Sequence, residues 1–223
     1  MDAAVSPILI SLKTASASIL ATFFLGIFAA KLVVGIRSKT LKMILDAVLT
    51  LPLVLPPTVA GFFLLYLFGV RGPAGRFFLD FFSVKIAFSW GATVLAAVAL
   101  SFPLMYRSAR GALEQVDPAL AHAARTLGMS EWRVFWQVSL PTALPGVASG
   151  GVLSFARGLG EFGATAMLAG NIAGRTRTLP LAVYSAVAAG DMDTAYRYVL
   201  VIVAISFAVV ALMNYFAAKG AKP

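Results

Sequence analysis

The chain has 223 residues, of which 60% are hydrophobic and 12% charged, and its formal net charge is +9. Soluble domains carry about 25% charged residues, so this composition indicates an integral membrane protein and argues against a nucleic-acid-binding one. The absence of Cys and the presence of a single His exclude disulfides, thiolate chemistry and multi-His metal sites. We therefore expect no metal centre and no bound cofactor.

A helix that crosses a bilayer needs about 20 mostly apolar residues. The sequence contains five such stretches, which predict an all-α protein with five transmembrane helices. They are Pro7–Gly35, Met43–Phe68, Ala87–Tyr106, Thr142–Leu168 and Ala195–Ala217. A shorter apolar stretch, Leu179–Ala189, predicts a re-entrant or interfacial helix. The first residues, MDAAVSP, lack the basic start of a signal peptide.

An odd number of spans places the two termini on opposite sides of the membrane. One side then carries nine basic residues, Arg37, Lys39, Lys42, Arg107, Arg110, Arg125, Arg133, Lys219 and Lys222. The other side carries five, Arg71, Arg76, Lys85, Arg175 and Arg177. The positive-inside rule assigns the richer side to the cytoplasm. We therefore expect a multi-pass plasma-membrane protein with its N-terminus outside and its C-terminus inside.

Two of the predicted spans contain residues that disturb a regular helix or bring helices close. Pro52, Pro56 and Pro57 in the second span remove backbone donors and favour a kink. That kink serves either helix packing or a transport pathway. Gly146 and Gly150 in the fourth span form a G-x-x-x-G pair, which lets two helices approach closely.

The most polar region lies within residues 107–141 and predicts two short helices joined by a glycine outside the bilayer. Asp117 and Pro118 suit the start of the first helix. Gly128 suits its left-handed end, and Ser130 suits the cap of the second helix. The apolar side of this unit indicates either a docking surface for another protein or contact with the membrane surface.

This loop resembles that of importer permeases of the ATP-binding cassette type, whose pattern is E-A-A, three residues, G, nine residues, I-x-L-P. The matching residues are His122, Ala123, Ala124, Gly128, Val138, Leu140 and Pro141. Two positions depart, since His122 replaces Glu and Val138 replaces Ile. The resemblance implies a type I importer permease fold in one domain over residues 7–217, with loop 107–141 coupling transport to a separate ATP-hydrolysing subunit.

Longer blocks are similar to those of the molybdate/sulfate permease group. They are LPLVLPPTVAG, AARTLGMSEWRVFWQVSLP, FARGLGEFGAT and AGNIAGRTRTLPLAVY, and the last favours molybdate. The resemblance implies a homodimer, two ATPase subunits, an external molybdate-binding protein and the molybdate oxyanion as cargo. A sulfate, thiosulfate or tungstate permease would share nearly every feature. A secondary transporter or channel would keep the spans but need no docking loop.

The sequence contains no G-x-x-x-x-G-K-[ST] phosphate loop, so we expect neither ATP hydrolysis by this chain nor any catalytic residue. The stretch FARGLGEFGATAML does contain G-x-G-x-x-G at Gly158, Gly160 and Gly163. A dinucleotide site requires that pattern to follow a strand. Because this copy lies in an apolar run, we interpret its glycines as helix-packing residues.

Arg157 and Glu161 in the same stretch are four residues apart and would share one face of a continuous helix. Counted from Pro141, they lie ~24 Å and ~30 Å along that helix, in the outer half of the membrane. Ionisable residues at membrane depth are usually functional. We interpret the pair as organising an outer gate, and the alternative is a purely structural ion pair.

The charge of the cargo limits which residues bind it. A carboxylate would repel a dianion, and a lone buried arginine would hold it too tightly for release. We therefore expect the oxyanion to pass hydroxyls and amide donors, with Thr165, Asn171, Thr176 and Thr178 as candidates. Arg175 and Arg177 either attract the oxyanion, contact the binding protein or remain solvated.

Overall fold

The computed structural model describes residues 5–220, with side chains described for all of them except 213 and 216–220. The first helices are α1 (Ser6–Val34), α2 (Lys39–Val54), α3 (Pro57–Phe68), α4 (Pro73–Phe82) and α5 (Trp90–Glu114). They are followed by α6 (Pro118–Thr126), α7 (Glu131–Val134), the π-helical turn η1 (Phe135–Ser139) and α8 (Leu140–Leu159). The last are α9 (Gly163–Leu168), α10 (Leu179–Ala188) and α11 (Met192–Gly220). No strand occurs in residues 5–220, so the all-α prediction is confirmed.

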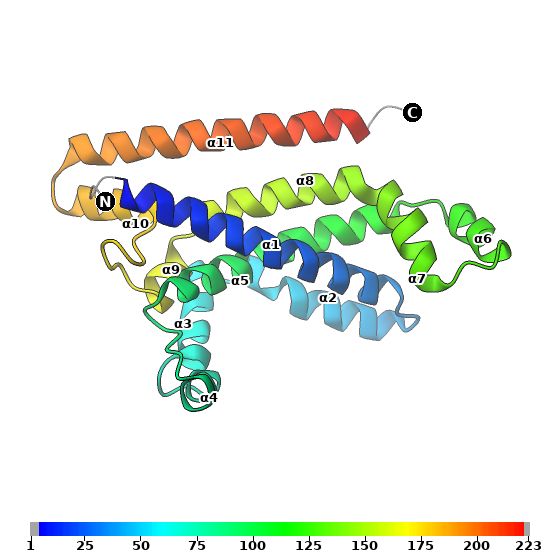
Figure 1. Ribbon diagram of the computed structural model, residues 1–223, viewed down its shortest axis with the longest axis horizontal. Helices are drawn as coiled ribbons and strands as arrows, with labels where there is room; N and C mark the ends of the chain where they lie inside the picture. The colour runs from blue at the N-terminus through cyan, green and yellow to red at the C-terminus, as the bar shows by residue number, and fades with distance from the viewer. Residues whose placement is uncertain (1–4, 221–223) are drawn as a thin grey trace.

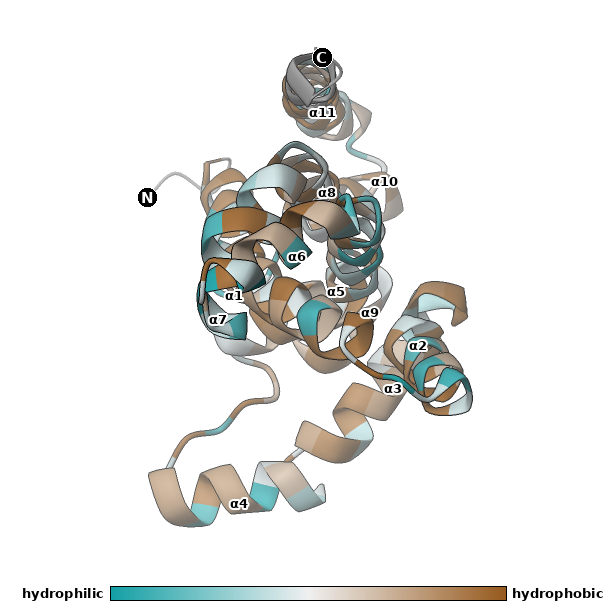
Figure 2. Ribbon diagram, turned by 90° about the vertical axis from the view of Figure 1, so that its right-hand side faces the viewer, coloured by the Kyte–Doolittle hydropathy of each residue, from teal (hydrophilic) through white to brown (hydrophobic). Residues whose placement is uncertain are grey.

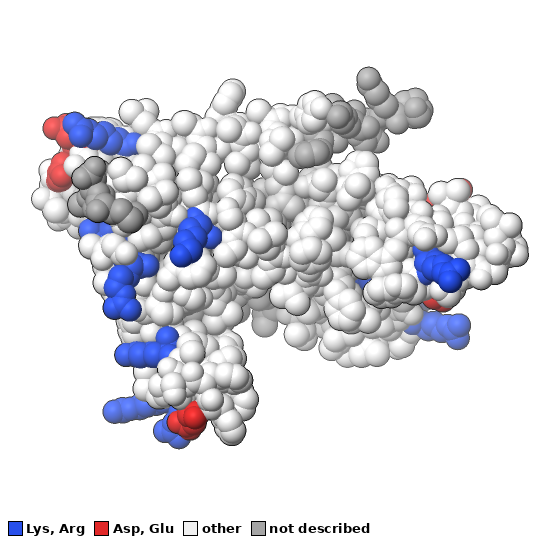
Figure 3. All heavy atoms as spheres, in the orientation of Figure 1, with Lys and Arg blue, Asp and Glu red and all other residues white. Residues whose placement is uncertain are grey.

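The long helices run along the long axis of the molecule, with α6 and α7 at one end and α9 and α10 at the other (Figure 1). Four helical stretches are long and apolar enough to cross a membrane, namely α1, α5, Glu131–Leu159 and α11. The bent pair α2 and α3 corresponds to the second predicted span and brings the total to five if the pair is counted as one span. On the face drawn in Figure 3, charged side chains gather toward the two ends and leave a largely uncharged band between them. This distribution fits a bilayer crossed along the long axis.

The centre of the molecule is a bundle of α1, α5 and α8, with α11 and α3 to α4 outside it (Figure 2). Small residues bring α5 and α8 close together. A Cβ built on Gly150 would lie 2.4 Å from the Cβ of Ser108, and one on Gly146 would lie 2.8 Å from the Cβ of Ala112. The packing role predicted for the G-x-x-x-G pair is therefore confirmed.

Hydroxyl groups pair across the contact between α1 and α5. Thr14 Oγ1 lies 2.9 Å from Thr93 Oγ1, and Trp90 Nε1 donates to Thr14 Oγ1 at 3.1 Å. Eight residues further along α1, Thr22 Oγ1 lies 3.2 Å from Ser101 Oγ. Such interhelical bonds hold helices together in a medium where lipid competes equally for apolar surfaces.

The second predicted span is broken rather than kinked, so the prediction of one continuous helix over Met43–Phe68 is wrong. The axes of α2 and α3 differ in direction by 110°. Pro56 and Pro57 lack backbone N–H groups, and a proline pushes the preceding residue out of the helical region. Leu55 and Pro56 accordingly have extended ψ angles of 140° and 134°.

The fourth predicted span is also wrong at its outer end, because α8 stops at Leu159 and a new short helix begins at Gly163. Gly160, which closes α8, has low helix propensity. The side chain of Glu161 then accepts a hydrogen bond from the N–H of Ala164 in the first turn of α9. The local chemistry thus favours a second helix start over continuation of the first.

The loop prediction is correct for α6 and wrong for the segment that follows. Asp117 Oδ1 accepts from the N–H of Ala119 at 2.8 Å, and Gly128 has a φ of +80°. Ser130 precedes α7, but its backbone oxygen, not its hydroxyl, accepts from Val134 N at 2.9 Å. Because α7 continues through η1 into α8, the second short helix is not a separate element.

The third predicted span, Ala87–Tyr106, also differs from the prediction at its boundaries. α5 extends through Glu114, so Arg107 and Arg110 lie on a helix and not in a loop. The short helix predicted over Leu179–Ala189 is present as α10. Lys222 and the side chain of Lys219, both used in the charge count, lie outside the described residues.

A network of charged and polar side chains holds α2 against α5. Tyr106 Oη donates to Asp46 Oδ1 at 3.0 Å, and Arg110 pairs with the same carboxylate. Glu114 Oε1 accepts from Arg110 Nε at 3.1 Å and from Lys42 Nζ at 2.7 Å. No residue of α2 is fully buried. The network, together with half-buried leucines, therefore fixes the position of this helix.

The close approach of α3 to α9 gives a testable prediction. A Cβ on Gly61 would lie 2.6 Å from the Cα of Ala164, a backbone atom that yields less readily than a flexible side chain. We expect Gly61→Val to destabilise the protein by about 1–3 kcal/mol, measured as a lower Tm in detergent. Gly111→Ala is the control, since a Cβ there meets no atom within 4 Å. An unchanged Tm for Gly61→Val would contradict this packing.

Candidate functional site

The break between α8 and α9 holds an ion pair at membrane depth. Arg157 lies in the last turn of α8, and its Nη1 is 2.6 Å from Glu161 Oε2. The other oxygen, Oε1, accepts from the N–H of Ala164 at 2.8 Å. Among the described residues, Glu161 is the only charged residue that is buried, with 2% of its surface exposed. Both carboxylate oxygens are therefore satisfied within one chain.

The two helix breaks of the molecule meet at this point. A Cβ on Gly163, at the start of α9, would lie 2.9 Å from Pro57 Cβ at the start of α3. Phe162, in the break itself, packs against Tyr184 of α10 with ring centroids 5.4 Å apart. Thr165 follows on α9 and is 1% exposed. Glu161 is thus enclosed where these helix ends meet, whereas the side chain of Arg157 keeps 28% of its surface exposed.

The segment between α9 and α10 is tied together by Asn171. Its Oδ1 accepts from Arg177 Nε at 2.8 Å, and its Nδ2 donates to Ser185 Oγ on α10 at 2.7 Å. Within the same turn, Thr176 Oγ1 accepts from the N–H of Ile172 at 3.0 Å. The segment is therefore a structured turn. Arg177 is hydrogen-bonded to the side-chain amide of Asn171, whereas Arg175 is exposed.

Thr178 precedes α10 but does not cap it. Its hydroxyl oxygen is buried and makes no hydrogen bond. The first N–H of α10, that of Leu179, instead donates to Ser11 Oγ of α1 at 2.7 Å. An unpaired buried hydroxyl is costly, so Thr178 has bonding capacity that this conformation does not use.

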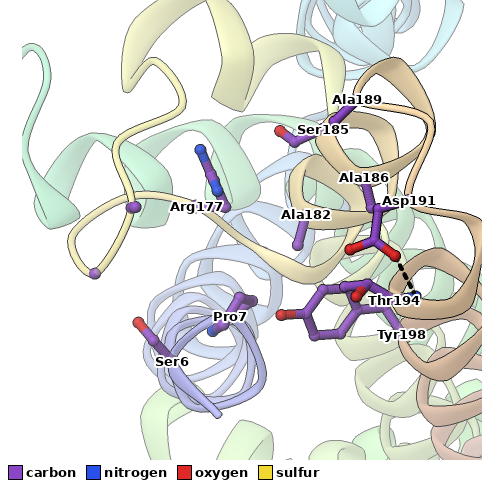
Figure 4. Close-up of a pocket in the computed structure, with 12 residues that line it drawn as sticks. Ser6, Pro7, Arg177, Ala182, Ser185, Ala186, Ala189, Asp191, Thr194 and Tyr198 are labelled. Carbon is purple, nitrogen blue, oxygen red and sulfur yellow. Dashed lines mark hydrogen bonds between the residues drawn. The ribbon is translucent and has the colours of Figure 1, made fainter. Parts of the chain in front are cut away.

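A cavity of about 680 Å³ opens at the same end, between the starts of α1 and α11 and the side of α10 (Figure 4). Arg177, Ser185 and Tyr198 line it together with Asp191. Hydrogen bonds from Thr194, including N–H to Oδ1 at 3.1 Å, hold the pKa of Asp191 below its ordinary value. The Asp191 carboxylate thus accepts from a backbone N–H in the first turn of α11. Because the cavity carries both signs of charge, it does not select anions.

The candidate gate and path residues therefore form two groups. Arg157, Glu161 and Thr165 lie at the break, whereas Asn171, Thr176 and Thr178 lie in the turn before α10. Of the four candidate path residues, only Asn171 is exposed in this conformation. Their contact with cargo stays a prediction.

The candidate coupling residues lie at the opposite end of the molecule and also divide in two (Figure 1). His122 and Ala123 are exposed on α6, and Ala124 is buried beneath them. Gly128 ends this helix in the left-handed conformation. Val138, Leu140 and Pro141 instead belong to η1 and the first turn of α8.

A bidentate ion pair joins these two parts. Arg125 Nε and Nη2 donate to Glu131 Oε1 and Oε2 at 2.6 Å and 3.1 Å. The Glu131 carboxylate raises the pKa of the Arg125 guanidinium. The pair therefore remains charged at neutral pH and fixes α6 relative to α7.

Sequence reasoning missed two sets of residues, although each left a signal. One is the polar stripe of α1, formed by Ser11, Thr14, Ser18 and Thr22 at helical spacing in an apolar stretch. The other is Asp46, a single carboxylate within the second predicted span. An isolated carboxylate in such a stretch requires a partner, and the structure supplies Tyr106 and Arg110.

Residues 22–220 match the family model of the binding-protein-dependent transport system inner membrane component. The chain belongs to this family. The molybdenum transport system permease protein ModB of Escherichia coli (strain K12) is 48% identical over 207 residues, 92% of this chain and 89% of that protein. The putative molybdenum transport system permease protein YvgM of Bacillus subtilis is 41% identical, covering 91% and 88%. The sulfate transport system permease protein CysT of Escherichia coli is 36% identical, covering 78% and 62%.

Solved structures support the fold assigned to this family member. The MetNI methionine ABC transporter in an inward-facing conformation matches with a TM-score of 0.76 at 16% identity, covering 100% of this chain and 98% of that one. A bacterial ABC transporter involved in alginate import matches with a TM-score of 0.76 at 15% identity, covering 100% and 81%. The fold is that of a type I importer permease, and the chain is a multi-pass inner-membrane transport component.

The two bonds of Glu161 give a prediction about stability. Glu161→Gln keeps an oxygen that can accept from Ala164 N but loses the charge opposite Arg157, whereas Glu161→Ala loses both. Because a lost helix cap costs about 1 kcal/mol, we expect Tm to fall in the order parent, Gln variant, Ala variant. Thermal unfolding of the purified protein in detergent measures this order. Equal Tm values for the two variants would contradict the capping role.

Proposed function

We propose that this chain is the permease subunit of an ATP-driven molybdate importer. The observation that carries the proposal is the 48% identity with a molybdenum permease over 92% of the chain. Sulfate is the second candidate cargo, because a sulfate permease is similar over a shorter part, at 36% identity over 78%. Molybdate and sulfate are both tetrahedral dianions, so one architecture suits either.

The proposed complex contains two copies of this chain around a central path, two ATPase subunits and an external binding protein. The α6 end supports ATPase docking, since Leu120 and Leu127 are 45% and 82% exposed on an element outside the spans. With that end in the cytoplasm, the C-terminus lies inside and the N-terminus outside. The binding protein then meets the end that carries α9 and α10.

Arg157 and Glu161 are proposed to organise the outer gate and not to bind cargo. Support comes from the burial of Glu161 at the break between α8 and α9, because movement of these two helix ends relative to each other would disturb its bonds to Arg157 and Ala164. A carboxylate also repels the dianion. Uptake by an importer carrying Glu161→Gln distinguishes a gate from a purely structural pair. Loss of uptake with normal ATPase binding supports the gate, and normal uptake overturns it.

The oxyanion is proposed to pass Thr165, Asn171, Thr176 and Thr178 when this gate opens. The unused hydroxyl of Thr178 supports the idea, because it offers a donor without breaking an existing bond. The Asn171 amide is bonded to Ser185 and Arg177 in this conformation and would exchange one of these partners. Neutral donors suit a path, because binding must be weak enough for release.

Transport by the reconstituted complex tests the proposed cargo. We expect ATP-driven uptake of labelled molybdate into proteoliposomes that contain this chain, its ATPase subunit and its binding protein. Excess tungstate should compete strongly and sulfate weakly, because tungstate matches molybdate in size and charge. Vesicles without ATP are the control. Preferential competition by sulfate would overturn molybdate in favour of the second candidate.

The glycine at the end of α6 allows a direct test of ATPase docking. A Cβ at Gly128 meets no atom within 4 Å, so a large side chain there would project outward without a clash inside the chain. We expect Gly128→Trp to weaken capture of the ATPase subunit at least about tenfold, a loss of ~1.4 kcal/mol. Gly128→Ala is the matched control, because it carries the same backbone strain at φ +80° without the bulk. Equal capture by both variants would contradict docking at this point.

A further inference from the structure

A second hollow, of about 480 Å³, opens between α5 and α8 near the α6 end, away from the gate candidates. Arg107, Ser108, Gln115 and Thr142 supply its polar lining, and Gly111 and Gly146 supply small residues. No Asp or Glu lines it. We propose that this hollow is the inner exit of the anion path, and that Arg107 gives it the positive potential that draws the oxyanion through. The proposal rests on the proposed function as an oxyanion importer.

The electrostatic argument depends on the contrast between two arginines on α5. Arg110 is neutralised, because it pairs with both Asp46 and Glu114. In the described part of the chain, Arg107 forms no ion pair and is exposed to solvent. The charge of Arg107 therefore contributes to the potential in the hollow, whereas the charge of Arg110 is neutralised by the carboxylates that position α2.

The depth of Arg107 fits the inner mouth of a path. It lies 17 residues after Trp90, the first residue of α5, which corresponds to ~26 Å along the helix. The hydrocarbon layer is about 30 Å thick. An unpaired cation near its edge normally faces water, and an exposed guanidinium binds an anion only weakly. Weak attraction at the inner mouth favours departure of the cargo.

The size and lining of the hollow suit a small tetrahedral anion. Gly111 lines the hollow without filling it, and a Cβ there would meet no atom within 4 Å. The amide of Gln115 and the hydroxyl of Ser108 offer neutral donors beside the guanidinium. In contrast, the cavity at the α10 end combines Arg177 with Asp191 and carries no net positive charge.

The potential is testable without any transport, because the chain has no Cys. A Gln115→Cys variant of the full chain, purified in detergent, carries one thiol within the hollow. The quantity measured is the rate of an anionic methanethiosulfonate reagent divided by that of its cationic analogue. We expect this ratio to be higher at the introduced thiol than at a small free thiol, and Arg107→Gln to lower it by about threefold or more. Arg37→Gln, at an exposed arginine outside the hollow, should leave the ratio unchanged. A ratio unaffected by Arg107→Gln overturns the proposal.

Uptake by the reconstituted importer then tests the role of the charge. We expect Arg107→Gln to reduce uptake about fivefold while ATPase binding stays normal, Arg107→Lys to restore most of it, and Arg37→Gln to have no effect. Normal uptake by the Arg107→Gln variant overturns the proposal that the hollow is the exit. If the parent protein imports another oxyanion, molybdate is rejected as the cargo. The same variants assayed with that anion then still test whether the hollow is the exit.

The shape of the hollow provides an independent pair of variants. Gly111→Phe should fill the space and reduce uptake at least about tenfold, because the hollow is open at that Cβ and the helix tolerates a side chain there. Gly111→Ala is the matched control and should transport like the parent. Uptake at the parental rate by Gly111→Phe, with the protein folded and assembled, overturns the hollow as an exit.

Discussion

A hydrocarbon layer contains no water to bond a freed backbone group, so each break in a membrane helix must be buried in protein or line a water-filled cavity. This chain has two such breaks, one before Pro57 and one before Gly163. They cover each other, because Gly163 contacts Pro57 and Gly61 contacts Ala164. The two breaks thus supply protein cover to each other at that depth.

The buried carboxylate of Glu161 also stabilises one of these breaks. Glu161 supplies an acceptor to the first turn of α9 and a counter-charge to Arg157. Removing one member of a buried pair leaves an uncompensated charge and is strongly destabilising. The pair therefore connects the ending of α8 to the beginning of α9. A site that joins two helix ends through one side chain is well placed to respond when those ends move relative to each other.

In the inner half of the molecule, the distinguishing feature is the placement of charged side chains and not a helix break. One turn of α5 carries two arginines with different surroundings, since Arg110 pairs with carboxylates and Arg107 lines the hollow between α5 and α8. The first fixes α2, which has no fully buried residue of its own. The second is proposed to give the hollow between α5 and α8 a positive potential. Structural support and an open charge thus come from neighbouring positions of one helix, while α6 remains at the molecular surface.

The sequence by itself determined the membrane class, the positions of the apolar stretches along the chain, and the start and end of α6. These features depend on hydropathy over one bilayer thickness and on caps within a few residues, as at Asp117 and Gly128. Only the tertiary structure decided that two spans are broken, that Glu161 lies beside a helix start, and that Arg107 and Arg110 differ. The reason is physical: whether a helix breaks, or a charge is neutralised, depends on which distant groups pack against it. Asp46 and Arg110 are 64 residues apart in the chain, and no local pattern specifies their contact.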